Sequence, residues 1–252
     1  VLALVPGLFA PYDPYAVTTS LRGQPPSDLH PFGMDEVGRD VLSRVIYGAR
    51  IAMLVGLAST GLSLVIGVLV GGIAGYFRGW IDAVLMRIVD ALMAFPIIVL
   101  LIAIAAAIGP SLSNLIIILG ATVWARYARV VRADVLSLRE RDFVMAARTI
   151  GVPDLTILIR HILPNELGPI IVLASLSVAG NILAEATLSF LGLGAQPPEP
   201  AWGSMLAAGR TFILTYPHIA LFPGIAIALT VLAFNLVGDG LRDALDPRTQ
   251  EK

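Results

Sequence analysis

The sequence has 252 residues, of which 57% are hydrophobic and only 14% are charged, and its mean hydropathy is +0.84. Because a soluble domain carries about 25% charged residues, this composition excludes an ordinary water-soluble protein. The net charge of −1 provides no strongly basic surface for nucleic acid. The absence of cysteine excludes disulfides, thiolate metal sites and cysteine nucleophiles, and three scattered histidines argue against a metal site.

The first 50 residues predict the end of one membrane span followed by a long connection. Residues 1–10 are apolar and lack the charged flank and cleavage site of a signal peptide, so we expect the end of a first spanning helix truncated at its N-terminus. Residues 11–50 form the connection, and its last part predicts an interfacial helix with apolar residues at helical spacing beside three arginines. The residues concerned are Val41, Leu42, Val45, Ile46 and Ala49 with Arg39, Arg44 and Arg50.

Long uncharged stretches predict five further spans, since a spanning helix needs about 20 apolar residues. Gly109, Pro110 and Ser111 supply a turn between the second and third of these stretches. Long stretches without alternation are typical of helices and not of barrel strands. The predicted fold is therefore an all-α integral membrane protein with a transmembrane core at 51–238. We expect its spans at about 51–76, 88–108, 112–132, 167–191 and 211–238.

Three glycines, Gly67, Gly71 and Gly75, recur at a spacing of four within one predicted span. Small residues at this spacing let another helix approach closely inside a membrane. The approaching helix could belong to the same chain or to a partner.

Basic residues in the connections predict the orientation of the chain. Placing 77–88, 126–166 and the tail 239–252 on one side gathers 12 of the 17 lysines and arginines there. Cytoplasmic loops retain positive charge. These segments are therefore predicted to be cytoplasmic, and both termini with them, which puts residues 11–50 on the outer side.

The predicted cytoplasmic loop 133–166 has an ordered pattern. Asp142 to Ile150 predicts one short helix, Gly151 suits its C-terminal cap, Pro153 suits the first position of a second helix, and Pro164 is expected to end that helix. Such a helical hairpin either docks on a partner or caps the helical bundle.

No residue pattern predicts catalysis by this chain. A phosphate-binding P-loop requires a lysine after its glycines, and the only lysine is Lys252. The titratable residues in the predicted spans, Asp90, Glu185 and His218, are too scattered to suggest a nucleophile with its base. Asp90 lies three residues after Arg87, which predicts a local ion pair.

Polar residues in the last two spans are candidates for a translocation path. Asn181 and Glu185 are four residues apart and therefore share one helical face. Together with Asn235 they either line a polar passage or form a satisfied hydrogen-bond network between helices.

Three strings resemble a family of transport proteins. MAARTIGVPDLTILIRHILP at 145–164 resembles the EAA loop of binding-protein-dependent ABC permeases, in which Met145 stands where the family often has glutamate. HPFGMDEVGRDVLSRVIYGAR at 30–50 and EATLSFLGLGAQPPEPAWGSML at 185–206 resemble the C-type permeases of dipeptide and oligopeptide importers, a group that includes nickel and opine transporters. The resemblance implies an ATPase-coupling element made of Met145, Ala146, Ala147, Gly151, Leu163 and Pro164.

The same resemblance implies the six-helix transmembrane domain of a type I ABC importer in a prokaryotic cell membrane. It implies a heterodimer with a homologous permease, two ATPase subunits that bind ATP and Mg, and an extracytoplasmic substrate-binding protein, with no cofactor bound by this chain. The implied function is ATP-driven uptake of short peptides by alternating access, with a nickel or opine importer as the alternative. A secondary transporter would favour broken spans with convergent carboxylates, a pattern that the sequence lacks, and an intramembrane enzyme would need a catalytic constellation.

Overall fold

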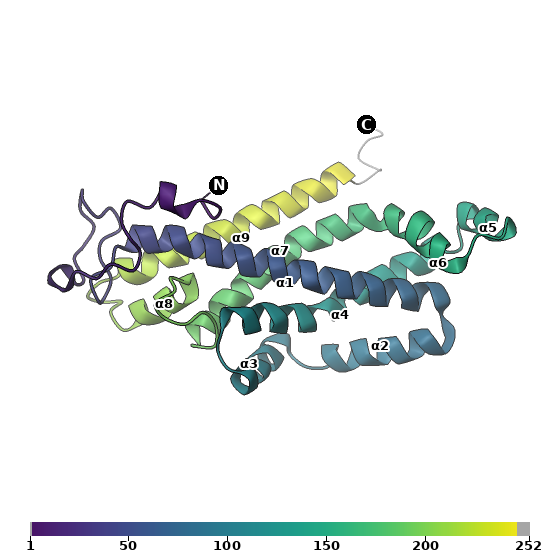
Figure 1. The fold of residues 1–252 in the computed structure, drawn as a ribbon, viewed down its shortest axis with the longest axis horizontal. Coiled ribbons are helices and arrows are strands. Elements are labelled where there is room, and N and C mark those ends of the chain that lie inside the picture. The colour runs from purple at the N-terminus through teal and green to yellow at the C-terminus, as the bar shows by residue number, and fades with distance from the viewer. Residues whose placement is uncertain (1, 246–252) are drawn as a thin grey trace. The chain divides into compact units, whose positions relative to one another are not determined.

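The computed structural model describes residues 2–245, which form helices and connections (Figure 1). Apart from one isolated bridge between Met34 and Asp40, the described part of the chain contains no β-structure. The predicted all-α fold is confirmed. Val1 and residues 246–252, which include part of the predicted tail 239–252, lie outside the described residues.

The helices agree with most of the predicted spans and differ from them in several bounds and in one break. Within residues 2–245, four helices are long and apolar enough to cross a membrane, or five if α2 and α3 form one bent span; α6 and α7 count as one continuous helix in this comparison. The helices are α1 Val41–Phe77, α2 Gly79–Met93, α3 Ile97–Ile108, α4 Leu112–Leu138, α5 Asp142–Thr149, α6 Asp154–Ile157, α7 Leu167–Phe190, α8 Trp202–Arg210 and α9 His218–Leu245.

The expected interfacial helix near residue 45 is not a separate element. Helix α1 begins at Val41 and continues without a break into the predicted span at 51–76. The Asp40 carboxylate accepts a hydrogen bond from the Ser43 backbone N–H (2.7 Å), which caps the start of the helix. No proline follows that could end the helix, so both predicted segments form one helix.

The predicted span 88–108 is two helices. Helices α2 and α3 meet at a bend of 86° around Ala94 to Pro96. Pro96 has no backbone N–H and disfavours helical geometry at Phe95, which explains the break.

In the loop, Pro164 does not end a helix, in contrast to Pro96 and to the prediction. The chain continues from α6 through a π-helical turn at Leu158–Ile162 and a 3-10 turn at Leu163–Glu166 into α7. These irregular turns accommodate a residue that cannot donate a backbone hydrogen bond. Pro153, expected at the first position of the second helix, lies one residue before it at the N-cap of α6.

Two predicted span ends are also corrected. Residues 2–10, expected to end a spanning helix, contain turns and a 3-10 helix at Pro6–Leu8. The last span begins at His218 and not near residue 211, because residues 211–217 form turns that end at Pro217.

The chain divides into two compact units. Unit 1 contains Val1–Ala58, Ile102–Ile116 and Val178–Phe234, and unit 2 contains Ser59–Leu101, Ile117–Ser177 and Asn235–Lys252. The core of unit 1 joins residues of α1, α7, α8 and α9, among them Val41, Ile182, Trp202 and Ile227. A Cβ atom at Gly203 would lie 2.1 Å from the Ala186 carbonyl oxygen, so α8 approaches α7 too closely for a side chain there.

Unit 2 is built around contacts of α4. Gly67, Gly71 and Gly75 all lie against it: a Cβ atom at these positions would lie 2.4 Å, 2.5 Å and 2.8 Å from atoms of Tyr127, Ala128 and Arg132. The glycine spacing therefore serves packing within this chain.

Ion pairs tie α2 to α4 in the same unit. Asp82 pairs with Arg132 (2.5 Å), and Asp90 pairs with Arg129 and not with Arg87 as predicted. Asp82 and Asp90 are eight residues apart and so lie on one face of α2, toward α4. Sequence spacing alone cannot identify a partner on another helix.

Candidate functional site

The loop expected to couple to an ATPase begins with helix α5. Its bounds, Asp142–Thr149, agree with the predicted helix, and Gly151 follows with a φ of +82°. The Val152 N–H donates to the Ala147 carbonyl (3.1 Å) and the Gly151 N–H donates to the Arg148 carbonyl (3.0 Å), which together form a glycine-capped helix end. A Cβ at Gly151 would meet no atom within 4 Å, so glycine is required here for backbone conformation and not for space.

Helix α5 has one face inside unit 2 and one face outside it. Val144 and Ala147 are buried in a cluster with Tyr76, Ile157 and Ile162. The other face is solvent-exposed and includes Phe143, Met145, Ala146 and Ile150, of which Ile150 is 80% exposed. Ala147, one of the residues that the resemblance assigns to ATPase coupling, packs against its own chain. Ala146 is the alanine that remains accessible.

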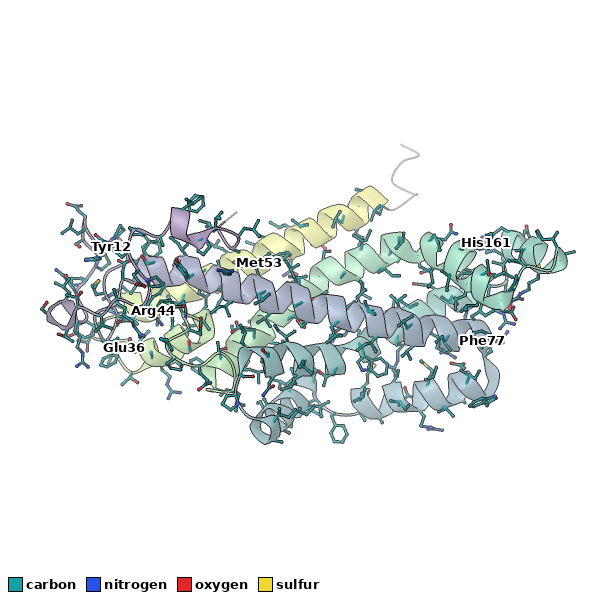
Figure 2. The ribbon with its side chains drawn as sticks, viewed as in Figure 1. Tyr12, Glu36, Arg44, Met53, Phe77 and His161 are labelled. Atoms are coloured by element: carbon teal, nitrogen blue, oxygen red, sulfur yellow. The ribbon has the colours of Figure 1, made fainter. Side chains whose placement is uncertain are left out.

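The second half of the loop contributes less to the exposed face. Leu163 is half-buried against the same internal cluster, whereas Pro164 is exposed at the start of the 3-10 turn. His161 lies near this turn in Figure 2. The predicted coupling residues therefore divide between an exposed set (Met145, Ala146, Gly151 and Pro164) and an internal set (Ala147 and Leu163).

The loop is held by Tyr76, the residue before Phe77 at the end of α1. Figure 2 labels Phe77. The Tyr76 hydroxyl donates to Asp154 Oδ1 at the start of α6 (2.5 Å), and the Tyr76 carbonyl accepts a hydrogen bond from Arg139 Nη1 (2.6 Å). The guanidinium carbons of Arg148 and Arg139 lie 5.3 Å and 5.7 Å from the ring centroid, within the range of cation–π attraction. Tyr76 is 3% exposed. One side chain thus contacts both arms of the loop, and we name Tyr76, Arg139, Arg148 and Asp154 the tyrosine anchor.

The candidate translocation residues fall in different units. Asn181 and Glu185 belong to α7 in unit 1, and both are buried, with Glu185 1% exposed. The Ser189 hydroxyl, one turn further on, donates to Glu185 Oε1 (2.7 Å). Asn235 belongs to unit 2 and is half-buried. Within unit 1, Glu185 therefore has a hydrogen-bond partner on its own helix.

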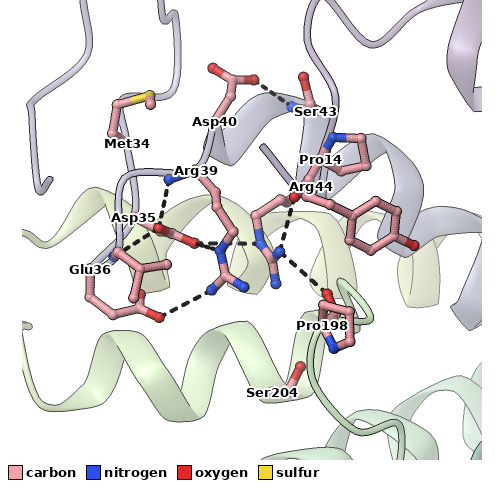
Figure 3. Close-up of polar contacts among 12 residues, drawn as sticks. Pro14, Met34, Asp35, Glu36, Arg39, Asp40, Ser43, Arg44, Pro198 and Ser204 are labelled. Carbon is pink, nitrogen blue, oxygen red and sulfur yellow. Dashed lines mark hydrogen bonds and ion pairs between the residues drawn. The ribbon is translucent and has the colours of Figure 1, made fainter. Parts of the chain in front are cut away.

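The two strings at 30–50 and 185–206 meet in unit 1 at a cluster of charged side chains (Figure 3). We name this cluster the arginine clasp, and it consists of Asp35, Arg39 and Arg44. Arg39 Nε donates to Asp35 Oδ2 (2.6 Å), and Arg44 Nε lies 3.6 Å from the same oxygen. Arg44 Nη1 donates to the carbonyls of Pro14 (3.1 Å) and Pro198 (3.5 Å). Arg44 is 4% exposed, so these carbonyls and Asp35 replace the water that its charge would otherwise require.

Contacts around the clasp extend this junction. Trp202 Nε1 donates to the Val45 carbonyl (2.9 Å), and the Tyr15 hydroxyl donates to Glu199 Oε2 (3.4 Å). Partial burial and the neighbouring Glu199 carboxylate raise the pKa of Tyr15, which keeps this phenol protonated as a donor. The clasp borders a cavity of about 90 Å³.

Residues 67–251 match the family described as "Binding-protein-dependent transport system inner membrane component". The chain belongs to this family. The dipeptide transport system permease protein DppC of Alkalihalophilus pseudofirmus is 49% identical over 245 residues, which cover 96% of this chain and 81% of that protein. The glutathione transport system permease protein GsiD of Escherichia coli is 47% identical over 250 residues, which cover 98% of this chain and 82% of that protein.

A solved structure shares the fold of this inner membrane component. A chain of the MetNI methionine ABC transporter, solved in inward-facing conformations, superposes with a TM-score of 0.64 at 19% identity, over 81% of this chain and 96% of that one. The chain is thus a multi-pass inner membrane protein with the fold of a type I ABC importer permease.

The tyrosine anchor was not predicted from the sequence of this inner membrane component. Tyr76 lies at the end of an apolar stretch, and its partners lie more than 60 residues further along the chain. The available signal was a pair of basic residues, Arg139 and Arg148, flanking a short helix. That signal indicated a cytoplasmic loop but not the aromatic ring that the two arginines contact.

Proposed function

We propose that this chain is the membrane-spanning permease subunit of an ABC importer that carries short peptides into the cytoplasm. The observation that carries the proposal is the identity of 49% and 47%, over nearly the whole chain, to permeases named for dipeptide and glutathione transport. A nickel or opine importer is the alternative, because the resemblance of the strings at 30–50 and 185–206 extends to those groups. The excess of basic residues in alternate connections supports cytoplasmic termini.

Energy for transport would come from other subunits. The chain's single lysine, Lys252, leaves it without a P-loop, so ATP and Mg would bind two separate ATPase subunits. A homologous permease would complete the pathway as a heterodimer, and an extracytoplasmic binding protein would deliver the substrate. The family description, which specifies binding-protein-dependent transport, supports the binding protein among these partners.

The loop is proposed to receive the motion of the ATPases. Its exposed apolar side chains, Phe143, Met145 and Ile150, offer a surface that a partner would bury, since contiguous exposed apolar residues mark interaction sites. The tyrosine anchor fixes this surface to the end of α1. Closure of the ATPases would then move the loop and α1 together, as a rigid change between inward-facing and outward-facing states.

Asn181, Glu185 and Asn235 remain proposed as residues of the translocation path. Glu185→Gln removes the charge and keeps the size and hydrogen-bonding capacity of the side chain. If Glu185 contributes to the path, this variant assembles normally but takes up peptide more slowly or with altered selectivity. Wild-type uptake and selectivity in an equally assembled Glu185→Gln transporter would remove Glu185 from the path.

The proposed function is tested with the complete transporter reconstituted in proteoliposomes. ATP is enclosed inside the vesicles, and labelled dipeptide is added to the medium outside. We expect accumulation against a gradient that requires ATP, the binding protein and both permeases. Competition with unlabelled dipeptide, nickel and an opine distinguishes the substrate classes. ATP-dependent uptake of labelled nickel or opine by a transporter that takes up no labelled dipeptide would contradict the peptide assignment.

A further inference from the structure

An apolar groove of about 380 Å³ lies in unit 1 along the face that α7 shares with α9. Four of its residues follow one face of α7 and four follow one face of α9, and Leu206 of α8 completes the lining. The residues are Leu183, Ala186, Thr187, Phe190, Leu206, Gly224, Ile227, Ala228 and Val231. This volume is within the range of about 300–1,000 Å³ typical of small-molecule sites.

The groove offers no hydrogen-bonding partner for a peptide. Its only polar side chain, Thr187, donates its hydroxyl to the Leu183 carbonyl of the same helix (2.8 Å). Both flanking helices are apolar and long enough to cross a membrane. A peptide would leave its backbone groups unpaired in this groove, which is costly in an apolar environment, whereas a hydrocarbon chain would not.

One end of the groove carries a cation. Phe190 lines that end, and the guanidinium carbon of Arg210 lies 5.7 Å from the centroid of its ring. Arg210 is exposed, in the last turn of α8. Among residues 2–245, no carboxylate forms an ion pair with it. An apolar groove that ends at an unpaired guanidinium complements a molecule with a hydrocarbon tail and an anionic head.

We propose that this groove binds an anionic phospholipid, with an acyl chain between α7 and α9 and the phosphate-bearing headgroup at Arg210. Guanidinium groups recognise phosphate oxygens by paired, charge-assisted hydrogen bonds. The acyl chain supplies the affinity, and Arg210 supplies the preference for a negatively charged headgroup. The groove shares no residue with the tyrosine anchor or the arginine clasp, and lipid binding is measured without transport, so its test does not depend on the proposed transport function.

Two substitutions test the two parts of the site. Arg210→Gln removes the cation and leaves the groove. Gly224→Leu fills the groove: a Cβ at this position meets only Leu206 Cδ2, at 3.7 Å, so a larger side chain can be placed without displacing the backbone. Gly61→Leu is the matched control, because Gly61 is an exposed glycine of α1 with no atom within 4 Å of its Cβ position.

The measurement is native mass spectrometry of the purified, delipidated complete transporter titrated with phosphatidylglycerol or phosphatidylcholine. We expect Arg210→Gln to weaken phosphatidylglycerol binding about fivefold, the effect of one basic residue at an anionic surface, and to leave phosphatidylcholine binding unchanged. Gly224→Leu should weaken both lipids, and Gly61→Leu neither. Unchanged lipid binding in Gly224→Leu would overturn the proposal. If that variant instead released the second permease subunit, the groove would be a subunit interface, which would also overturn it.

Discussion

The arginine clasp and the coupling loop organise polar and apolar groups in opposite ways. In the clasp, buried charges are paired within the chain: the Asp35 carboxylate accepts hydrogen bonds from the Val37 and Arg39 backbone N–H groups and from the Arg39 side chain. In the loop, the charged groups gather around Tyr76, while Phe143 and Ile150 face outward. Most polar groups of the clasp are paired within the chain, although Arg44 Nε lies 3.6 Å from Asp35 Oδ2 and makes no hydrogen bond. The loop instead leaves apolar side chains exposed.

The clasp should therefore be the more sensitive region for stability of the chain itself. Arg44→Ala removes the donor to the Pro14 and Pro198 carbonyls and one of the two guanidinium groups beside Asp35, and a buried polar group that loses its partner costs about 1–3 kcal/mol each. We expect the melting temperature of the purified transporter to fall by about 10 °C. Arg50→Ala, at an exposed position of the same helix, serves as control. Equal stability of the two variants would show that the clasp does not hold the two strings together.

The loop should respond most strongly to a change in backbone conformation. Gly151→Ala places a side chain at a φ of +82°, which costs about 1–2 kcal/mol, and would displace the exposed face of α5. We expect peptide uptake to fall severalfold while ATP hydrolysis continues. Gly79→Ala imposes similar strain at a φ of +60°, also with no atom within 4 Å, but outside the loop. If both variants lost uptake equally, the effect would come from general strain and not from the loop.

The tyrosine anchor should give the smallest effect, and the most specific one. Tyr76→Phe removes one hydrogen bond to a carboxylate but keeps the ring that both arginines contact, so uptake should fall less than in Gly151→Ala. We expect normal assembly but fewer peptides transported per ATP hydrolysed. Asp154→Asn and the double variant complete a cycle in which the two losses should not add. Additive losses would indicate that Tyr76 and Asp154 act separately.

Hydropathy and turn residues predict most of the fold, because each span is encoded by its own apolar stretch. Helix α5 and its glycine cap were likewise predicted from residues adjacent in the sequence. The start of α1 was predicted wrongly, since three arginines beside apolar residues suggested a separate interfacial helix. Arg44 is one of the three. Its charge is instead satisfied by the carbonyls of Pro14 and Pro198, the latter 154 residues away. Local patterns cannot reveal such distant partners.

The candidate site shows the same limit. The structure has the short helix predicted around Ala146 and Ala147, and Gly151 has the backbone conformation expected of it. The spacing could not tell which alanine faces inward, because that depends on contacts with Tyr76 and Ile157. Asp90 likewise pairs with Arg129 on α4 and not with its sequence neighbour Arg87.

The outward face of α5 can be tested directly because the chain contains no cysteine. Ala146→Cys and Ala147→Cys each introduce a single thiol, the first exposed and the second at a position 6% exposed. In the assembled transporter, a short reagent with one thiol-reactive end and one photoreactive end should join Ala146→Cys to an ATPase subunit and leave Ala147→Cys unlinked. If Ala146→Cys remained free to react and formed no link to an ATPase, the proposed docking of this loop would be contradicted.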